Sequence, residues 1–107
     1  MRWTVLVVNE TVAAEIEELP ADMRARLARL SKVIQELGFE ALPRDSVKHL
    51  AQKLWELRVT GRGGTSRAIY LTASGQRVVI LRVFVKKTQK TPRREIEIAL
   101  ERAKEIK

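Results

Sequence analysis

The spacing of apolar residues changes near the middle of the chain, and this change restricts the fold more than any other feature. Over residues 20–38, apolar side chains recur in steps of 4, 3, 4 and 3, the period of one buried helix face: Met23, Leu27, Leu30, Ile34 and Leu37. Three runs rich in β-branched residues follow at 53–60, 66–72 and 77–87. Their short connections predict neighbouring antiparallel strands.

The flanking segments complete the expected order of one strand, two helices, three strands and a final helix. Alternating apolar residues predict a strand over 2–8, and Asn9 is a suitable cap for a helix over 10–19. We expect 39–49 to be a connecting loop, because it contains a proline. Thr91 and Pro92 are expected to open the last helix, as its cap and its first residue.

These elements predict one domain over residues 1–107, of the α+β class. A helical hairpin and a C-terminal helix would pack on a small antiparallel sheet. The chain has no cysteine, which excludes disulfide frameworks and thiol catalysis. No segment approaches the ~20 apolar residues of a membrane span. We therefore expect a soluble cytoplasmic protein that does not enter membranes.

The central half of the chain is strongly basic. Residues 44–94 carry 13 lysines and arginines against only Asp45 and Glu56, a local charge of +11. The remaining residues sum to −3, which restores the net charge of +8. Such a concentration repels itself unless a polyanion or an acidic partner lies against it, and nucleic acid is the commonest partner of this kind. A solubilising surface is the alternative interpretation.

Several kinds of catalytic site are not indicated. His49 is the only histidine, so a paired-histidine ribonuclease site is not available, and a catalytic triad is not readily offered. His49 could still act as a single acid or base, although a loop histidine is more often inert. The acidic residues lie mostly in helical stretches, which suits solvated faces better than a metal site. We therefore predict no metal and no cofactor. The glycine-rich stretch 61–67, which contains Arg62, lacks the spacing of a phosphate-binding P-loop; it is either a flexible hairpin or a phosphate contact.

Strand alternation predicts a cationic sheet face. Trp55, Leu57 and Val59 should face the helices, which leaves Glu56 and Arg58 on an open face. Because neighbouring strands lie about 4.8 Å apart, cations on adjacent strands can converge on one patch. The candidates besides Arg58 are Arg67, Arg82, Lys86, Lys87 and Lys90.

Such a patch meets the needs of RNA cleavage without a metal. Arginine binds phosphate oxygens bidentately and stays charged, whereas crowded positive charge favours the neutral form of a lysine. Glu56 is an isolated acid among these basic residues, so it should stay ionised. It could serve as a base or orient an arginine. A solvated face with an ordinary Glu56–Arg58 contact is the simpler alternative.

Three stretches resemble a known family: KHLAQKLWELR (48–58), SRAIY (66–70) and FVKKTQKTPRREIEIA (84–99). They are similar to the phage-derived, Gp49-like branch of HigB toxins, within the RelE/ParE superfamily. The resemblance implies the toxin of a toxin–antitoxin pair, a ribosome-dependent endoribonuclease acting on mRNA. It also implies a cognate antitoxin of the helix-turn-helix type.

The resemblance also assigns roles to individual residues. Arg67 matches the family's phosphate-stabilising arginine, and Lys87 matches a second cationic position near the scissile phosphate. Glu56 and Arg58 match the strand that carries further catalytic side chains. The RNA-binding residues expected around them are Arg62, Arg82, Lys86 and Lys90.

One departure from the family pattern concerns proton transfer. Many relatives carry a tyrosine or histidine near the C-terminus of the active face, but the only tyrosine here, Tyr70, has the opposite strand parity to Arg67. The general acid and base are therefore unassigned. A ParE-like toxin that inhibits DNA gyrase and a non-catalytic RNA- or ribosome-binding module are the alternatives.

Overall fold

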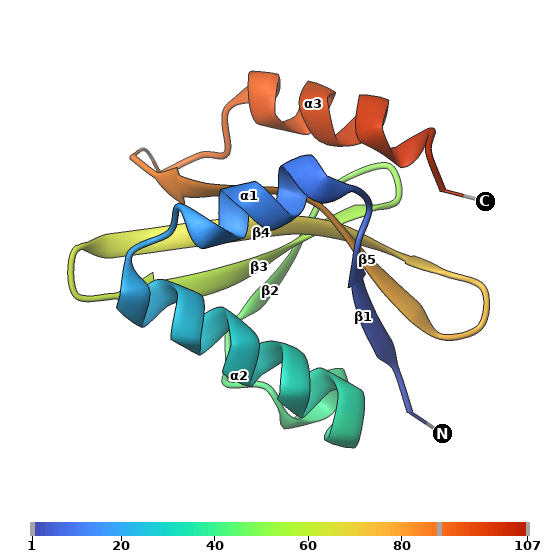
Figure 1. Cartoon of the computed structure of the whole chain (residues 1–107), viewed down its shortest axis with the longest axis horizontal. Coiled ribbons are helices and arrows are strands. Elements are labelled where there is room, and N and C mark those ends of the chain that lie inside the picture. Colours follow the sequence, from blue (N-terminus) through green and yellow to red (C-terminus); the bar gives the residue numbers. More distant parts are fainter. Residues whose placement is uncertain (1, 88, 107) are drawn as a thin grey trace.

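A five-stranded sheet in the order β1-β5-β4-β3-β2 forms the centre of the molecule (Figure 1). The computed structural model describes residues 2–87 and 89–106, so Thr88 of the 84–99 motif lies outside the described residues. Parallel pairing joins β1 to β5, and every other neighbouring pair is antiparallel. The strands are β1 (Thr4–Val7), β2 (Val47–Ala51), β3 (Leu54–Gly61), β4 (Gly64–Ala73) and β5 (Arg77–Lys86).

Within the described residues, three α-helices pack on this sheet: α1 (Glu10–Glu17), α2 (Ala21–Leu37) and α3 (Arg93–Ala103). The Asn9 side chain accepts a hydrogen bond from the backbone N–H of Val12 at 3.1 Å, which confirms the predicted cap of α1. Figure 1 shows α2 and α3 on opposite sides of the sheet. None of the helices among the described residues is long and apolar enough to cross a membrane.

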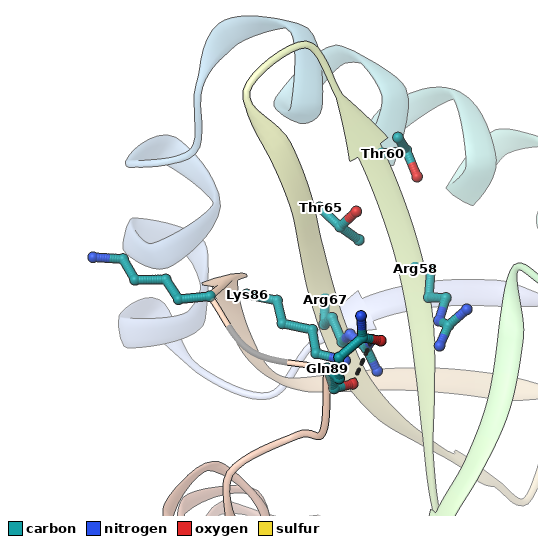
Figure 2. Close-up of a pocket in the computed structure, with 7 residues that line it drawn as sticks. Arg58, Thr60, Thr65, Arg67, Lys86 and Gln89 are labelled. Carbon is teal, nitrogen blue, oxygen red and sulfur yellow. Dashed lines mark hydrogen bonds between the residues drawn. The ribbon is translucent and has the colours of Figure 1, made fainter.

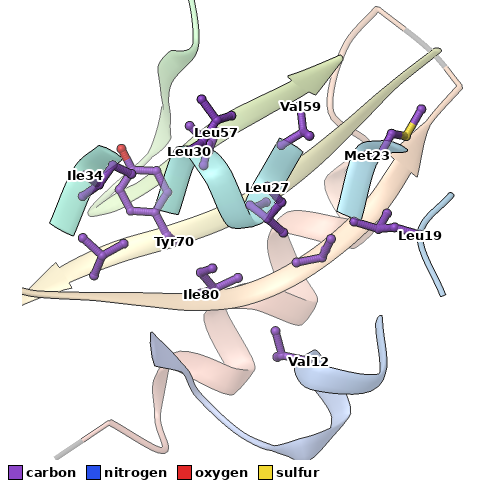
Figure 3. Close-up of a cluster of buried hydrophobic side chains, with 13 residues drawn as sticks. Val12, Leu19, Met23, Leu27, Leu30, Ile34, Leu57, Val59, Tyr70 and Ile80 are labelled. Atoms are coloured by element: carbon purple, nitrogen blue, oxygen red, sulfur yellow. The ribbon is translucent and has the colours of Figure 1, made fainter. Parts of the chain in front are cut away.

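The two faces of the sheet carry separate cores. The stripe of α2 packs on one face with Val12 of α1, as Figure 3 shows. The sheet residues of this first core are Leu57, Val59, Ala68, Tyr70, Val78, Ile80 and Val83. On the other face α3 contributes Ala99 to a second core, which contains Leu54, Ile69, Leu71, Val79 and Leu81. The second core leaves the sheet free near the β3–β4 hairpin.

Three sequence-based expectations about the fold are wrong in detail. The sheet is mixed rather than antiparallel, because β1 pairs in parallel with β5 at the edge. The predicted loop 39–49 contains a short 3₁₀ helix at Phe39–Ala41 and then the start of β2. Leu37 completes the apolar spacing of α2, but it is the last residue of the helix and is 70% exposed.

A β-bulge interrupts the pairing of β4 with β5. Ile69 pairs with Arg82, whereas the next residue, Tyr70, pairs with Ile80, so Leu81 is left as an extra residue in β5. Ile80 and Val83 therefore both join the first core although they are three residues apart. The bulge thus resets which side chains of β5 face each side of the sheet.

Candidate functional site

A polar cavity of about 440 Å³ opens on the α3 side of the sheet, next to the β3–β4 hairpin (Figure 2). Its walls come from the three central strands and from the segment that leaves β5. The lining residues are Arg58, Thr60, Thr65, Arg67, Lys86, Lys87 and Gln89. Among the residues that the structure describes, this lining includes four cations and no carboxylate.

The register of the strands explains why these cations meet. Arg58 of β3 pairs directly with Arg67 of β4, and Lys86 of β5 pairs with Thr65 of β4. Two like charges placed opposite each other on antiparallel strands destabilise a sheet. The pairing of two arginines therefore opposes folding stability, and a ligand that carries negative charge would relieve the repulsion.

Arg67 is held rigidly at the base of the cavity. It is only 4% exposed, and its guanidinium forms an ion pair with Glu56. The same guanidinium donates to Thr91 Oγ1 at 3.3 Å and to the backbone carbonyl of Gln89 at 3.4 Å. Burial lowers the pKa of Arg67 from its ordinary value, yet an arginine stays charged at neutral pH.

Glu56 differs from its predicted placement on an open face. It is fully buried (0% exposed), where β3 passes beneath the segment that leads into α3. Thr91 Oγ1 donates a hydrogen bond to Glu56 Oε2 at 2.5 Å. Glu56 therefore contacts Arg67 and Thr91 rather than solvent, and its contacts suit the predicted role of orienting an arginine.

The expectation that Thr91 caps α3 is wrong, because the Thr91 hydroxyl bonds to Glu56. The N-cap position is Pro92, and no side chain in the described part of the chain forms a capping hydrogen bond with α3. The hydroxyl of Thr91 bonds to Glu56 instead, which connects the start of α3 to the middle of β3. A threonine before a proline is typical of a helix cap, and the local pattern alone contains no sign of the distant carboxylate.

Several donor atoms in the cavity wall are buried without a partner. Within residues 2–87 and 89–106, Arg58 Nε, Arg67 Nε and Lys86 Nζ have no hydrogen-bond acceptor. A buried donor that lacks an acceptor costs about 1–3 kcal/mol, and more when it is charged. Three such donors belong to residues that line one hollow, which favours a ligand with several acceptor oxygens at this place.

The structure brings together only part of the predicted patch. Arg58, Arg67, Lys86 and Lys87 line the cavity, whereas Lys90 lines a neighbouring hollow. Lys48, His49, Leu50, Thr91, Arg93 and Ile96 complete that second hollow.

Arg62 lies in the β3–β4 turn outside the cavity lining. Its backbone N–H donates to the Asp22 carboxylate of α2 at 2.7 Å. This hydrogen bond is the main cause of the lowered pKa of Asp22. The bond fixes the tip of the hairpin.

Arg82 lies away from the cavity, in an ion-paired cluster. Its guanidinium contacts Glu15 of α1 at 2.5 Å and Glu95 of α3 at 2.6 Å. Burial lowers the pKa of Arg82, but the hydrogen bonds and charges of Glu95 and Glu15 outweigh this effect and raise it overall. The prediction that Arg82 joins the convergent patch is therefore wrong, because both carboxylates reach it from the helices.

Three of the lining residues were not predicted from the sequence. Thr60 lies two residues after Arg58, and Thr65 lies two residues before Arg67, so strand alternation was sufficient to find both. Gln89 lies in irregular structure after β5, where no periodic signal exists. Tyr70 lies on the opposite face to Arg67, as its parity predicted, and is buried in the first core. Its ring stacks on Phe39 at 5.7 Å between centroids.

Comparison with known proteins agrees with this fold. Residues 14–104 match the family described as phage-derived Gp49-like proteins (DUF891). A free-state arginine-to-alanine double mutant of the Escherichia coli toxin RelE superposes with a TM-score of 0.62 at 14% identity, covering 95% of this chain and 98% of RelE. An archaeal RelE–RelB complex from Pyrococcus horikoshii gives a TM-score of 0.55 at 22% identity, over 79% and 96% of the two chains. A comparison with curated proteins finds no match.

Proposed function

The chain belongs to the family of phage-derived Gp49-like proteins, and from this premise we propose that it is the toxin of a toxin–antitoxin pair that cuts messenger RNA on the ribosome. Its RelE fold supports the toxin assignment. The cationic cavity supports the nuclease assignment, because a bound anion would supply acceptors for donors that the protein leaves without partners.

The proposed reaction uses the substrate's own 2′-hydroxyl as the nucleophile. This oxygen attacks the adjacent phosphorus, and the 5′-oxygen leaves. Arg58 and Arg67 would bind the phosphate oxygens, whose negative charge increases as the phosphorane forms. Glu56 would keep Arg67 in position, and Lys87 would add a mobile cation at the rim.

The proposed partners follow from the same assignment. A ribosome carrying mRNA is the target, which requires a cytoplasmic location. The partner in the resting state would be an antitoxin, and the archaeal RelE with the similar fold is found in a complex with RelB. We expect a helix-turn-helix antitoxin. Because the binding surface is cationic, ribosome affinity should fall steeply with salt.

The decisive experiment measures mRNA cleavage on translating ribosomes by the purified wild type and by Arg58→Ala. Arg58 is half-buried and has no ion pair among the described residues, so its removal should spare the fold. We expect a loss of about 100-fold in the cleavage rate, the usual effect of removing one donor to a developing anion. The matched control is Arg29→Ala, an exposed arginine on α2.

Two outcomes would contradict the proposal. If the wild type leaves ribosome-bound mRNA intact, the nuclease assignment is wrong. If the same preparation blocks DNA supercoiling by gyrase, the ParE-like alternative replaces it. Equal cleavage by Arg58→Ala and the wild type would remove the cavity as the site.

A further inference from the structure

Lys86 occupies an unusual place in the cavity wall. It is the last residue of β5, and Figure 2 shows its side chain extending toward Arg67 and Gln89. The Nζ atom is buried and has no hydrogen-bond partner within residues 2–87 and 89–106. An ammonium group carries three donors and is strongly hydrated in water, so a buried ammonium without acceptors is unfavourable.

The charges around Lys86 are also unfavourable for an ammonium. Arg58 faces the cavity from β3, Arg67 faces it from β4, and Lys87 follows in the chain. The nearby acid, Glu56, is already paired with Arg67 and accepts from Thr91. Desolvation and like charges both favour the neutral amine, which is a base with a free electron pair.

We infer that Lys86 is the general base of the reaction, a role that rests on the proposed nuclease function. Because Nζ is buried in the free protein, the side chain must turn into the cavity when RNA binds. Its neutral Nζ then takes the proton from the 2′-hydroxyl as that oxygen forms its bond to phosphorus. The bond from phosphorus to the 5′-oxygen breaks, and this oxygen takes a proton from solvent water. The products are a 2′,3′-cyclic phosphate and a 5′-hydroxyl, and Lys86 then releases its proton to solvent.

The other cations of the cavity cannot take this role equally well. Arg58 and Arg67 stay protonated at neutral pH and therefore hold the phosphate. Lys87 lines the same cavity, but its side chain is exposed, so hydration stabilises its charged form. If Lys86 were only a positive charge for the phosphate, an arginine in its place would keep the activity.

The first test compares Lys86→Arg and Lys86→Met with the wild type in single-turnover cleavage of mRNA on ribosomes. Both variants should lose at least about 100-fold in rate, the usual contribution of a general base, while Lys86→Arg keeps its ribosome affinity. The wild-type rate should rise with pH to a plateau, whereas the residual rate of Lys86→Arg should lack that step. Thermal melting shows whether each variant is folded, and Lys86→Met should melt no lower than the wild type because it removes a partnerless polar group.

The second test replaces the base chemically. The chain contains no cysteine, so Lys86→Cys can be alkylated with 2-bromoethylamine at that position alone. The product, a thioether analogue of lysine, is a slightly weaker base. We expect alkylation to restore at least about tenfold of the lost rate and to move the pH step toward lower pH. Lys53→Cys, in the turn between β2 and β3, is the matched control and should cleave normally before and after alkylation.

The results separate this inference from the proposed function. Cleavage by the wild type together with near-normal cleavage by Lys86→Arg would overturn the base assignment and leave the nuclease intact. The base assignment would also be overturned if alkylated Lys86→Cys regained activity but its cleavage rate rose over the same pH range as that of the wild type. Lys86 would then act by its charge alone. Absence of cleavage by the wild type would overturn the proposed function and this inference with it.

Discussion

Two groups of partly buried arginines lie on this small sheet, and they differ in their acceptors. In the ion-paired cluster, Glu15 accepts from Arg82, from Arg102 and from the backbone N–H of Val83, and Glu95 adds a second acceptor for Arg82. In the cavity, Arg67 is the one cation of the described residues that forms an ion pair with Glu56. Three cavity donor atoms have no acceptor within the described residues.

The difference separates a structural role from a ligand-binding role. Charges in the ion-paired cluster connect α1, β5 and α3, and their pairing is complete without a ligand. Charges in the cavity are brought together by strand register, at a cost in stability, and lack sufficient acceptors. The supply of acceptors around a buried cation is therefore more informative than the number of cations.

The largest expected effect comes from Arg67, which belongs partly to both categories. Arg67→Ala should abolish cleavage and also lower the free energy of unfolding by roughly 3–5 kcal/mol, because it leaves the buried Glu56 carboxylate unpaired. Urea denaturation measures this loss. The double variant Glu56→Gln/Arg67→Met should recover most of the stability but no cleavage. Wild-type stability of Arg67→Ala would show that the pair is not structural.

The ion-paired cluster should give the opposite combination. Glu15→Gln removes the acceptor shared by Arg82 and Arg102, so the free energy of unfolding should fall by roughly 2 kcal/mol. Cleavage per folded molecule should stay unchanged. Glu101→Gln, which affects only an exposed pair with Lys104, is the control and should be almost neutral. A large loss of cleavage by folded Glu15→Gln would show that the ion-paired cluster is not purely structural.

A smaller effect on stability is expected from anion binding, which should occur in the cavity and not in the ion-paired cluster. Sulfate at ten times its dissociation constant should stabilise the wild type by about 1.4 kcal/mol through occupation of the cavity. Arg58→Ala should lose most of this gain, whereas Glu15→Gln should keep it. Thermal melts at equal ionic strength in sulfate and in chloride measure the difference. Equal gains in all three proteins would indicate general exclusion of sulfate rather than a site.

The smallest effect concerns the hairpin beside the cavity. The backbone N–H of Arg62 lowers the pKa of Asp22 in the folded state, so this carboxylate stabilises the fold above about pH 4 and loses that contribution as the pH falls through the lowered value. Asp22→Asn should therefore melt slightly lower than the wild type at pH 5–7. The gap should shrink below pH 4, whereas a gap that grows in acid would contradict this assignment. Glu18→Gln is an exposed control.

Local patterns predicted most of the fold. The apolar steps of α2 and the alternation in β3, β4 and β5 identify four elements, because each pattern reflects one buried face. The pairing of β1 with β5 was not predictable, since it joins residues more than 70 positions apart. β2 was missed because its residues, VKHLA, mix exposed and half-buried positions.

The site was predictable only where it depends on strand parity. Parity correctly placed Arg58 and Arg67 on one face and Tyr70 on the other. It did not reveal that Glu56 is buried or that Arg82 is ion-paired, because their environments are set by α1, α3 and the segment before α3. The separation of 67 positions between Glu15 and Arg82 exceeds the range of any local pattern.

The bulge at Leu81 divides β5 into two stretches whose alternation is out of phase. Shortening the strand by one residue at Leu81 would restore a regular ladder and keep Phe84 and Lys86 on their present side. Deletion of one residue after Arg82 would instead turn Phe84 and Lys86 toward the α2 layer and remove Lys86 from the cavity. Insertions and deletions in related chains should therefore be tolerated at this one point of β5, and the cavity-forming stretch beyond it should vary only by substitution.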